Sequence, residues 1–131
     1  MKALEGKVAV VTGSSKGIGR SIATAMAAHG ARVVISSRKA EVCEAVAAEI
    51  NAACAEGPGE AISIPAHIGE KEQLENLVAQ TRETWGQIDI LVCNAAVNPY
   101  YGPSKDIPDS AFDKIMNSNV KSNHWLCHMV L

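Results

Sequence analysis

The chain has 131 residues, of which 47% are hydrophobic and 20% charged, and its formal net charge is −2 at pH 7. This composition is too apolar for a disordered chain, and the length suits one compact domain. A nearly balanced charge gives no general attraction to nucleic acid or to an anionic membrane, so neither is expected as a partner. The sequence shows no secretory signal core, no apolar run as long as a membrane span, and no CxxC pair among its four cysteines. The absence of these features from the sequence predicts a cytoplasmic protein with reduced thiols.

Short apolar segments alternate with helical patterns along the chain. Residues 8–11 are β-branched or small and predict a buried strand. A helix is expected from Gly17 to the pair His29-Gly30, with one face formed by Ile18, Ile22, Ala25 and Met26. The alternation then continues with strands at 32–36, 61–65 and 88–93, helices at 39–51 and 70–84, a loop at 98–108, and a helical segment at 109–131 that is broken near 117–119.

Apolar strands separated by helices imply right-handed crossovers and a parallel sheet covered on both faces. The fold class expected is therefore α/β, with a doubly wound parallel sheet of the Rossmann type that is truncated after about four strands. Because the sequence stops at Leu131 inside a helical pattern, we expect residues 1–131 to be the front of a longer one-domain protein.

A glycine-rich loop directly after the first strand is the strongest motif. It reads Thr12-Gly13-Ser14-Ser15-Lys16-Gly17-Ile18-Gly19 and opens the first helix. Glycines permit a tight turn and a close approach of the backbone to a pyrophosphate, and the start of a helix presents N–H groups to that anion. The alternative is a glycine-rich turn without a ligand, but the flanking strands favour a dinucleotide site. The loop residues expected at the cofactor are Gly13, Ser15, Lys16, Gly17, Ile18 and Gly19.

The end of the second strand indicates which dinucleotide binds. An acidic residue at this place would bind the ribose 2′-hydroxyl of NAD. The chain instead has Ser37, Arg38 and Lys39, with no carboxylate before Glu41. Arginine suits a phosphate through its planar fork, and Lys16 adds a second positive charge. We therefore expect Ser37 and Arg38 to favour NADP over NAD, although NAD remains open because basic residues are also common in solvated turns.

These residues resemble the short-chain dehydrogenase/reductase family. The family's TGxxxGxG pattern is matched at 12–19, Asn94-Ala95-Ala96 is close to its NAG, and Asn119-Val120 lies where the family has a structural and catalytic asparagine. The resemblance runs along the whole chain and covers roughly the first half of a typical member.

The resemblance implies an oxidoreductase that transfers hydride between NAD(P)(H) and a small-molecule carbonyl or alcohol substrate. It implies that Asn94, Ala95, Ala96 and Val120 lie at the cofactor and that Asn119 helps to order a proton relay. The family's catalytic Ser, Tyr and Lys come from later segments, so this chain alone is expected to be inactive. Oligomerisation as a dimer or tetramer is expected through the helical region at 109–131.

After the third strand, the family usually has an aspartate and an apolar residue that hold the adenine, whereas this chain has His67-Ile68. Histidine can also donate or accept a hydrogen bond, so both residues are expected at the cofactor. This pair and residues 92–100 suggest the carbonyl-reductase branch of the family, which reduces dicarbonyls, aromatic ketones and retinal.

Two further patterns imitate functional motifs. Tyr101 and Lys105 spell YxxxK, but Gly102 and Pro103 break any helix there, so a surface loop is expected. His124 and His128 have a spacing that can bind zinc, but no carboxylate follows and packing or an interface is favoured, so no metal is expected.

Two other functions stay open on the sequence. The chain could be a dinucleotide-binding module without catalysis, or an interaction fragment that pairs with another chain along the open edge of its fourth strand.

Overall fold

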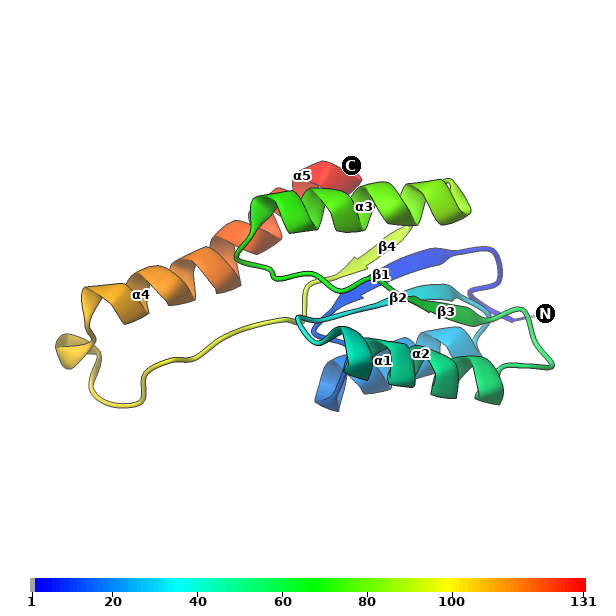
Figure 1. Ribbon diagram of the computed structural model, residues 1–131, viewed down its shortest axis with the longest axis horizontal. Helices are drawn as coiled ribbons and strands as arrows, with labels where there is room; N and C mark the ends of the chain where they lie inside the picture. Colours follow the sequence, from blue (N-terminus) through cyan, green and yellow to red (C-terminus); the bar gives the residue numbers. More distant parts are fainter. Residues whose placement is uncertain (1) are drawn as a thin grey trace.

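A parallel four-stranded sheet lies at the centre of residues 2–131, the part of the chain that the computed structural model describes (Figure 1). Its strands are β1 (Val8–Thr12), β2 (Arg32–Ser36), β3 (Glu60–Ser63) and β4 (Ile90–Val92), in the order β3-β2-β1-β4. The chain first moves outward from β1 to β3 and then crosses back to place β4 on the other side of β1. This order and the parallel pairing confirm the predicted Rossmann-type sheet.

Helices cover both faces of the sheet. Figure 1 shows α1 (Gly17–Ala28) and α2 (Ala40–Ala53) on one face and α3 (Lys71–Trp85) and α5 (Ser122–Val130) on the other. All five residues of β1 are buried because alternate side chains point into the two separate cores. Among residues 2–131, no helix combines the length and apolar character needed to cross a membrane.

The face of α1 that packs on the sheet differs from the predicted one. Its buried residues are Gly19, Ala23 and Ala27, while Ile18 is 74% exposed. Ala25 is also exposed, and Ile22 and Met26 are only partly buried at the side of the core. Small residues at a spacing of four let the helix axis approach the strands closely, so the large apolar side chains lie beside the contact.

Two strands are shorter than predicted. Strand β3 ends at Ser63, although Ile64 N still donates to Ile35 O (3.0 Å) and Ala66 N to Ser37 O (3.0 Å). Strand β4 has three residues, all half-buried, and it pairs only with β1 within residues 2–131. The segments that follow both strands therefore leave the sheet at the carboxyl ends of the strands, the end at which α1 begins.

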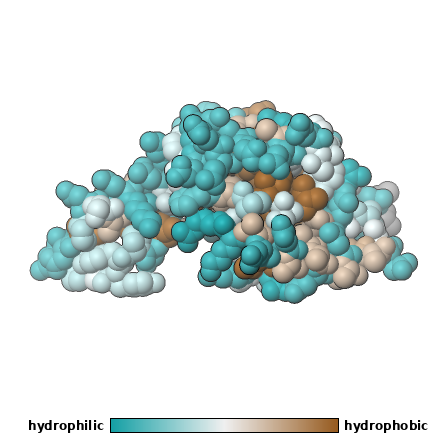
Figure 2. All heavy atoms as spheres, in the orientation of Figure 1, coloured by the Kyte–Doolittle hydropathy of each residue, from teal (hydrophilic) through white to brown (hydrophobic). Residues whose placement is uncertain are grey.

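The predicted break near 117–119 is a π-helical turn. Helix α4 (Asp109–Met116) continues through η2 (Asn117–Lys121) into α5 without ending. The preceding loop contains a short 3-10 turn, η1 (Ser104–Asp106). Helix α4 and this loop project away from the sheet, and Figure 2 shows a hollow between this arm and the body of the molecule.

Candidate functional site

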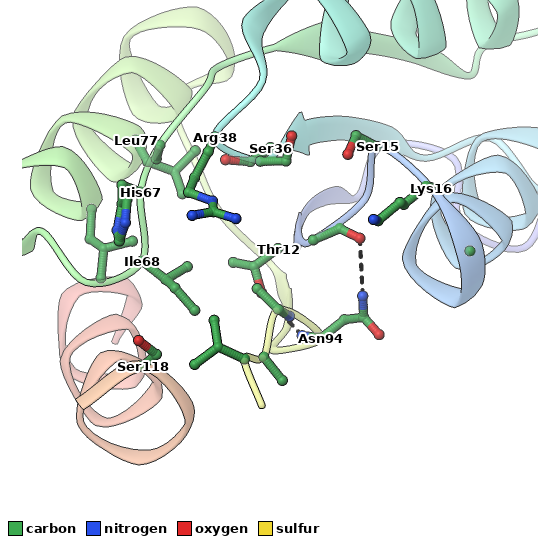
Figure 3. Close-up of a pocket in the computed structure, with 18 of the residues that line it drawn as sticks. Thr12, Ser15, Lys16, Ser36, Arg38, His67, Ile68, Leu77, Asn94 and Ser118 are labelled. Atoms are coloured by element: carbon green, nitrogen blue, oxygen red, sulfur yellow. Dashed lines mark hydrogen bonds between the residues drawn. The ribbon is translucent and has the colours of Figure 1, made fainter. Parts of the chain in front are cut away.

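A cavity of about 480 Å³ opens at the carboxyl ends of the strands (Figure 3). This is the crevice at which doubly wound sheets bind ligands, beside the point where the strand order reverses. It brings together the glycine loop, the end of β2, the segment after β3 and the segment after β4. The predicted residues that line it are Gly13, Ser15, Lys16, Gly17, Ile18, Ser37, Arg38, His67, Ile68, Asn94, Ala95 and Ala96.

The glycine loop is fixed to the ends of β1 and β2. Gly13 and Gly17 have φ angles of +63° and +59°, a region that favours glycine. The Ser14 hydroxyl donates to Val11 O (2.7 Å) and accepts from Ser36 N (2.9 Å), while Ser14 N donates to Ser36 O (3.1 Å). The backbone that faces the cavity is therefore held in place by the strands beneath it.

The start of α1 is left available to an anion. No side chain of residues 2–131 caps it, and its first turn carries no acidic residue. The first N–H groups of a helix lack intrahelical acceptors and carry its positive dipole end. Ile18 is exposed beside them at the margin of the cavity. This geometry suits a phosphate next to an apolar surface.

Thr12 and Asn94 join the glycine loop to the segment after β4. Thr12 Oγ1 accepts from Asn94 N and Ala95 N, each at 3.0 Å. Asn94 Nδ2 donates to Gly13 O at 3.1 Å, one of the dashed contacts in Figure 3. The prediction did not include Thr12 among the site residues, although the motif TGxxxGxG contains it.

The end of β2 supplies a free cation. Figure 3 shows the Arg38 guanidinium extending from the end of β2 into the space between His67 and Thr12. Within residues 2–131, neither Arg38 nor Lys16 forms a salt bridge. The Ser37 hydroxyl lies 3.1 Å from Cys43 Sγ and accepts from Lys39 N (3.2 Å), so it also holds the start of α2.

Three predicted residues lie outside the cavity lining. Gly19 is buried, and a Cβ there would lie 2.3 Å from Gly13 O and 2.5 Å from Asn94 Nδ2, so its place is in packing. Val120 is 53% exposed on η2. Asn119 donates to Val97 O and accepts from Val97 N, both at 2.8 Å. Asn119 therefore fixes the backbone of the segment after β4 without lining the cavity itself.

The structure adds lining residues that were not predicted. Leu74 and Leu77 come from the buried face of α3, and Lys114 and Ser118 come from α4 and η2. The periodicity of α3 indicates that its leucines point inward, but no local pattern shows that α4 returns to the cavity. The others are Thr12, Ser36, Ala66 and Val97.

The two imitating patterns lie apart from the cavity. Tyr101 is 86% exposed in the loop before α4 and does not line the site. The rings of His124 and His128 meet edge to face with centroids 4.5 Å apart. Across residues 2–131, no three His, Cys, Asp or Glu side chains lie close enough together to hold a metal ion.

Cys93 immediately precedes Asn94. Partial burial raises the pKa of its thiol, and the neighbouring thiol of Cys127 raises that pKa further. Since the thiolate is the reactive form of cysteine, the raised pKa lowers the reactive fraction of this exposed residue.

The sheet order and the crevice above it define a Rossmann-type α/β protein. The family model described as short chain dehydrogenase matches residues 7–131, and the chain therefore belongs to this family. The match confirms the resemblance noted from the glycine loop and the asparagine motifs.

Relatives and solved structures agree with this assignment. The chain is 40% identical to dehydrogenase/reductase SDR family member 4 from Bos taurus, covering 98% of this chain and 44% of the relative. It is 42% identical to the human mitochondrial member 2, with the same two coverages. A metagenomic short-chain oxidoreductase in complex with NADP superposes with a TM-score of 0.86 at 35% identity, over 96% of this chain and 55% of that one. A hydroxysteroid dehydrogenase from Escherichia coli gives 0.87 at 33% identity, over 97% and 52%. The chain thus spans less than half the length of these curated relatives.

Proposed function

We propose that this chain forms the cofactor-binding part of an oxidoreductase that transfers hydride between NADP(H) and a carbonyl or alcohol substrate. The observation that carries the proposal is the single cavity shared by the glycine loop, Arg38, His67-Ile68 and Asn94-Ala95-Ala96. The family membership and a related structure in complex with NADP support it. We propose the substrates of the carbonyl-reductase branch, which are dicarbonyls, aromatic ketones and retinal. The proposed location stays cytoplasmic, as the sequence signals indicate, although one relative is named as mitochondrial.

In this proposal each segment holds one part of the dinucleotide. The N–H groups at the start of α1 and the backbone of Gly13 and Gly17 bind the pyrophosphate. Arg38 and Lys16 bind the 2′-phosphate, and His67 with Ile68 holds the adenine. Asn94 and the two alanines after it line the path towards the nicotinamide, with Asn119 fixing their backbone through Val97.

The chemistry divides between cofactor and protein. A bound nicotinamide supplies or takes the hydride. The residues of this chain bind and orient the dinucleotide, and Thr12 holds the loop after β4 against β1. In the family, the acid that protonates the substrate oxygen comes from segments beyond those matched here.

Preference for NADP follows from charge. A 2′-phosphate needs cations with no carboxylate beside them, and Arg38 is exposed, unpaired within residues 2–131 and adjacent to the cavity. The 2′-hydroxyl of NAD instead favours an acidic acceptor at the end of β2. No acidic residue lines the cavity in the described part of the chain.

The test replaces Arg38 by aspartate and measures NADPH and NADH binding by calorimetry. We expect Arg38→Asp to lower the NADPH/NADH affinity ratio at least about 100-fold, because it removes an ion pair and adds an acceptor for the 2′-hydroxyl. Lys39→Asp is the matched control, since it makes the same charge change on a neighbour outside the cavity. Equal shifts in both variants would contradict a direct contact between Arg38 and the phosphate.

We also propose that copies of this chain associate through residues 109–131. The observation behind this is a row of exposed apolar side chains, Phe112 (51%), Met116 (40%) and Val120 (53%), at a spacing of four residues on one helical face.

A further inference from the structure

We propose that Asn51 closes the outer edge of the sheet at β3, and that this edge, when opened, pairs with β3 of a second copy of this chain. The surface involved lies outside the cavity lining, so the proposal does not depend on the proposed function. An uncovered edge strand offers a row of backbone N–H and C=O groups to any other strand. How open β3 is depends on which of its outward groups are covered.

Strand β3 lies at one edge of the sheet and, within residues 2–131, pairs only with β2. Ile64, directly after the strand, donates its N–H to Ile35 O of β2 at 3.0 Å. Along an extended strand, the backbone groups of successive residues point to opposite sides. The even-numbered residues of β3 therefore face β2, and the N–H and C=O groups of Ala61 and Ser63 point outward.

The side-chain amide of Asn51 covers both outward groups of Ala61. Its Nδ2 donates to Ala61 O at 2.9 Å, and its Oδ1 accepts from Ala61 N at 2.8 Å. One carboxamide thus makes both hydrogen bonds that a neighbouring strand would make with this residue. Asn51 lies in the last turn of α2, which packs beside β3, so its side chain reaches the edge directly from the helix.

Beyond Ala61 little of the edge is left. Pro65, at the next outward position after Ser63, has no N–H group to donate to an added strand. The side-chain oxygen of Ser63 is buried and makes no hydrogen bond within residues 2–131, so it does not cover the Ser63 backbone. Ser63 alone offers one N–H and one C=O group, which is too few to hold a strand. Asn51 therefore determines whether the edge can be used.

A second copy fits the opened edge because the edge is complementary to itself. Two copies of β3 related by a two-fold axis run antiparallel, and Ala61 of one copy then lies opposite Ser63 of the other. Residues that face each other in this way exchange both of their hydrogen bonds. In the closed state the Asn51 amide already occupies the Ala61 half of each pair.

The test compares three proteins that all carry Met116→Lys, which suppresses contacts through the exposed apolar row on α4 and η2. The first has Asn51, the second Asn51→Ala and the third Asn51→Asp. Alanine removes both hydrogen bonds and is the best helix former, so α2 is retained. Aspartate still accepts from Ala61 N, and its charge opposes a second strand at the edge.

Light scattering across a concentration series measures association of the three proteins. Amide hydrogen exchange at Ala61 shows whether the edge is open. Exchange at Val33, the residue of β2 in register with Ala61, reports whether the sheet itself stays intact. A fourth protein combines Asn51→Ala with Ser63→Pro, which removes the outward donor of Ser63 and places a ring at the edge.

We expect Asn51→Ala to speed exchange at Ala61, and to lower the concentration at which copies associate, by about tenfold or more, with exchange at Val33 unchanged. Asn51→Asp should associate no more than the protein with Asn51, and Ser63→Pro should reverse the association of the alanine variant. Unchanged exchange at Ala61, or equally faster exchange at Val33, would show that Asn51 is not a cover for the edge. Association that does not rise in Asn51→Ala, or that persists with Ser63→Pro, would exclude pairing through β3.

Discussion

Single hydroxyl and amide groups connect parts of this site that lie far apart in the sequence. Thr12 Oγ1 accepts two backbone N–H groups from the segment after β4, more than 80 residues away. Thr12 is 1% exposed and the two donor residues are half-buried, so water can replace this acceptor only in part. Buried donors without acceptors are costly, and this hydroxyl therefore contributes to both stability and the shape of the cavity.

Replacing Thr12 by valine should lower the free energy of unfolding by about 1–3 kcal/mol, because valine has the same shape and leaves two half-buried donors without this acceptor. Thr12→Ser retains the hydroxyl and should lose about 1 kcal/mol or less. Urea unfolding of the three proteins measures the difference. If serine and valine were equally destabilising, the methyl group rather than the hydroxyl would be the important part of Thr12.

At the scale of elements, Asn119 on the π-helical turn takes the place of a strand neighbour for the segment after β4. Its amide pairs with both backbone groups of Val97, in the way that an adjacent strand would. A π-helical turn widens the helix and shifts the direction of its side chains. The distortion in η2 thus coincides with the residue that supports the loop beside the cavity.

Asn119→Asp should speed amide hydrogen exchange at Val97 only moderately, while Asn119→Leu should speed it by about tenfold or more. Aspartate can still accept from Val97 N but cannot donate to Val97 O, and leucine can do neither. Exchange measured by NMR reports this opening directly. Unchanged exchange in the leucine variant would mean that the loop is held by other contacts.

Features that depend on residues close together in the sequence were predicted best. The strand, glycine loop and helix at 8–28 follow from β-branched residues and glycine spacing, and twelve of the predicted site residues line the cavity. The buried face of α1 was predicted incorrectly because hydrophobicity favoured Ile18, whereas close packing against the strands requires Gly19 and Ala23. Lys114 and Ser118 were not predicted because they reach the cavity through tertiary packing of α4 and η2.

At the scale of the whole molecule, α4 stands out from the body (Figure 1). Together with η2 it carries the exposed apolar row at Phe112, Met116 and Val120. Contiguous apolar side chains at the surface commonly mark contacts with another protein. The same helical segment continues into η2 and α5. Contact between copies here would therefore also stabilise the position from which Asn119 holds Val97.

Met116→Lys should weaken self-association of the protein at least about tenfold, since it places a charge at the centre of the apolar row. Asp113→Lys is the control, because it adds a lysine to an exposed polar position on the same helix. Size-exclusion chromatography with light scattering across a concentration series measures the association. Association that is unaffected by Met116→Lys would place the contact elsewhere.

A polypeptide of these 131 residues should bind NADPH but show no measurable carbonyl-reductase activity. Hydride transfer to a carbonyl needs an acid within hydrogen-bond reach of the developing alkoxide. The basic side chains that line the cavity in residues 2–131 are Lys16, Arg38, His67 and Lys114. The first three are assigned above to phosphate and base. Lys114 lies at the cavity one helical turn before Ser118.

Tyr101 is a candidate acid outside the cavity lining, and its position argues against it. Its side chain is 86% exposed, it does not line the cavity, and Gly102 and Pro103 prevent the helix that would align it with Lys105. The measurement is NADPH oxidation by the purified polypeptide with a panel of dicarbonyls and aromatic ketones, with a full-length short-chain dehydrogenase as the positive control. Turnover at ordinary enzyme rates that disappears in Tyr101→Phe would contradict this prediction and make Tyr101 the proton donor. Turnover that survives in Tyr101→Phe would point to Lys114, a cavity-lining cation that is not assigned above to phosphate or base.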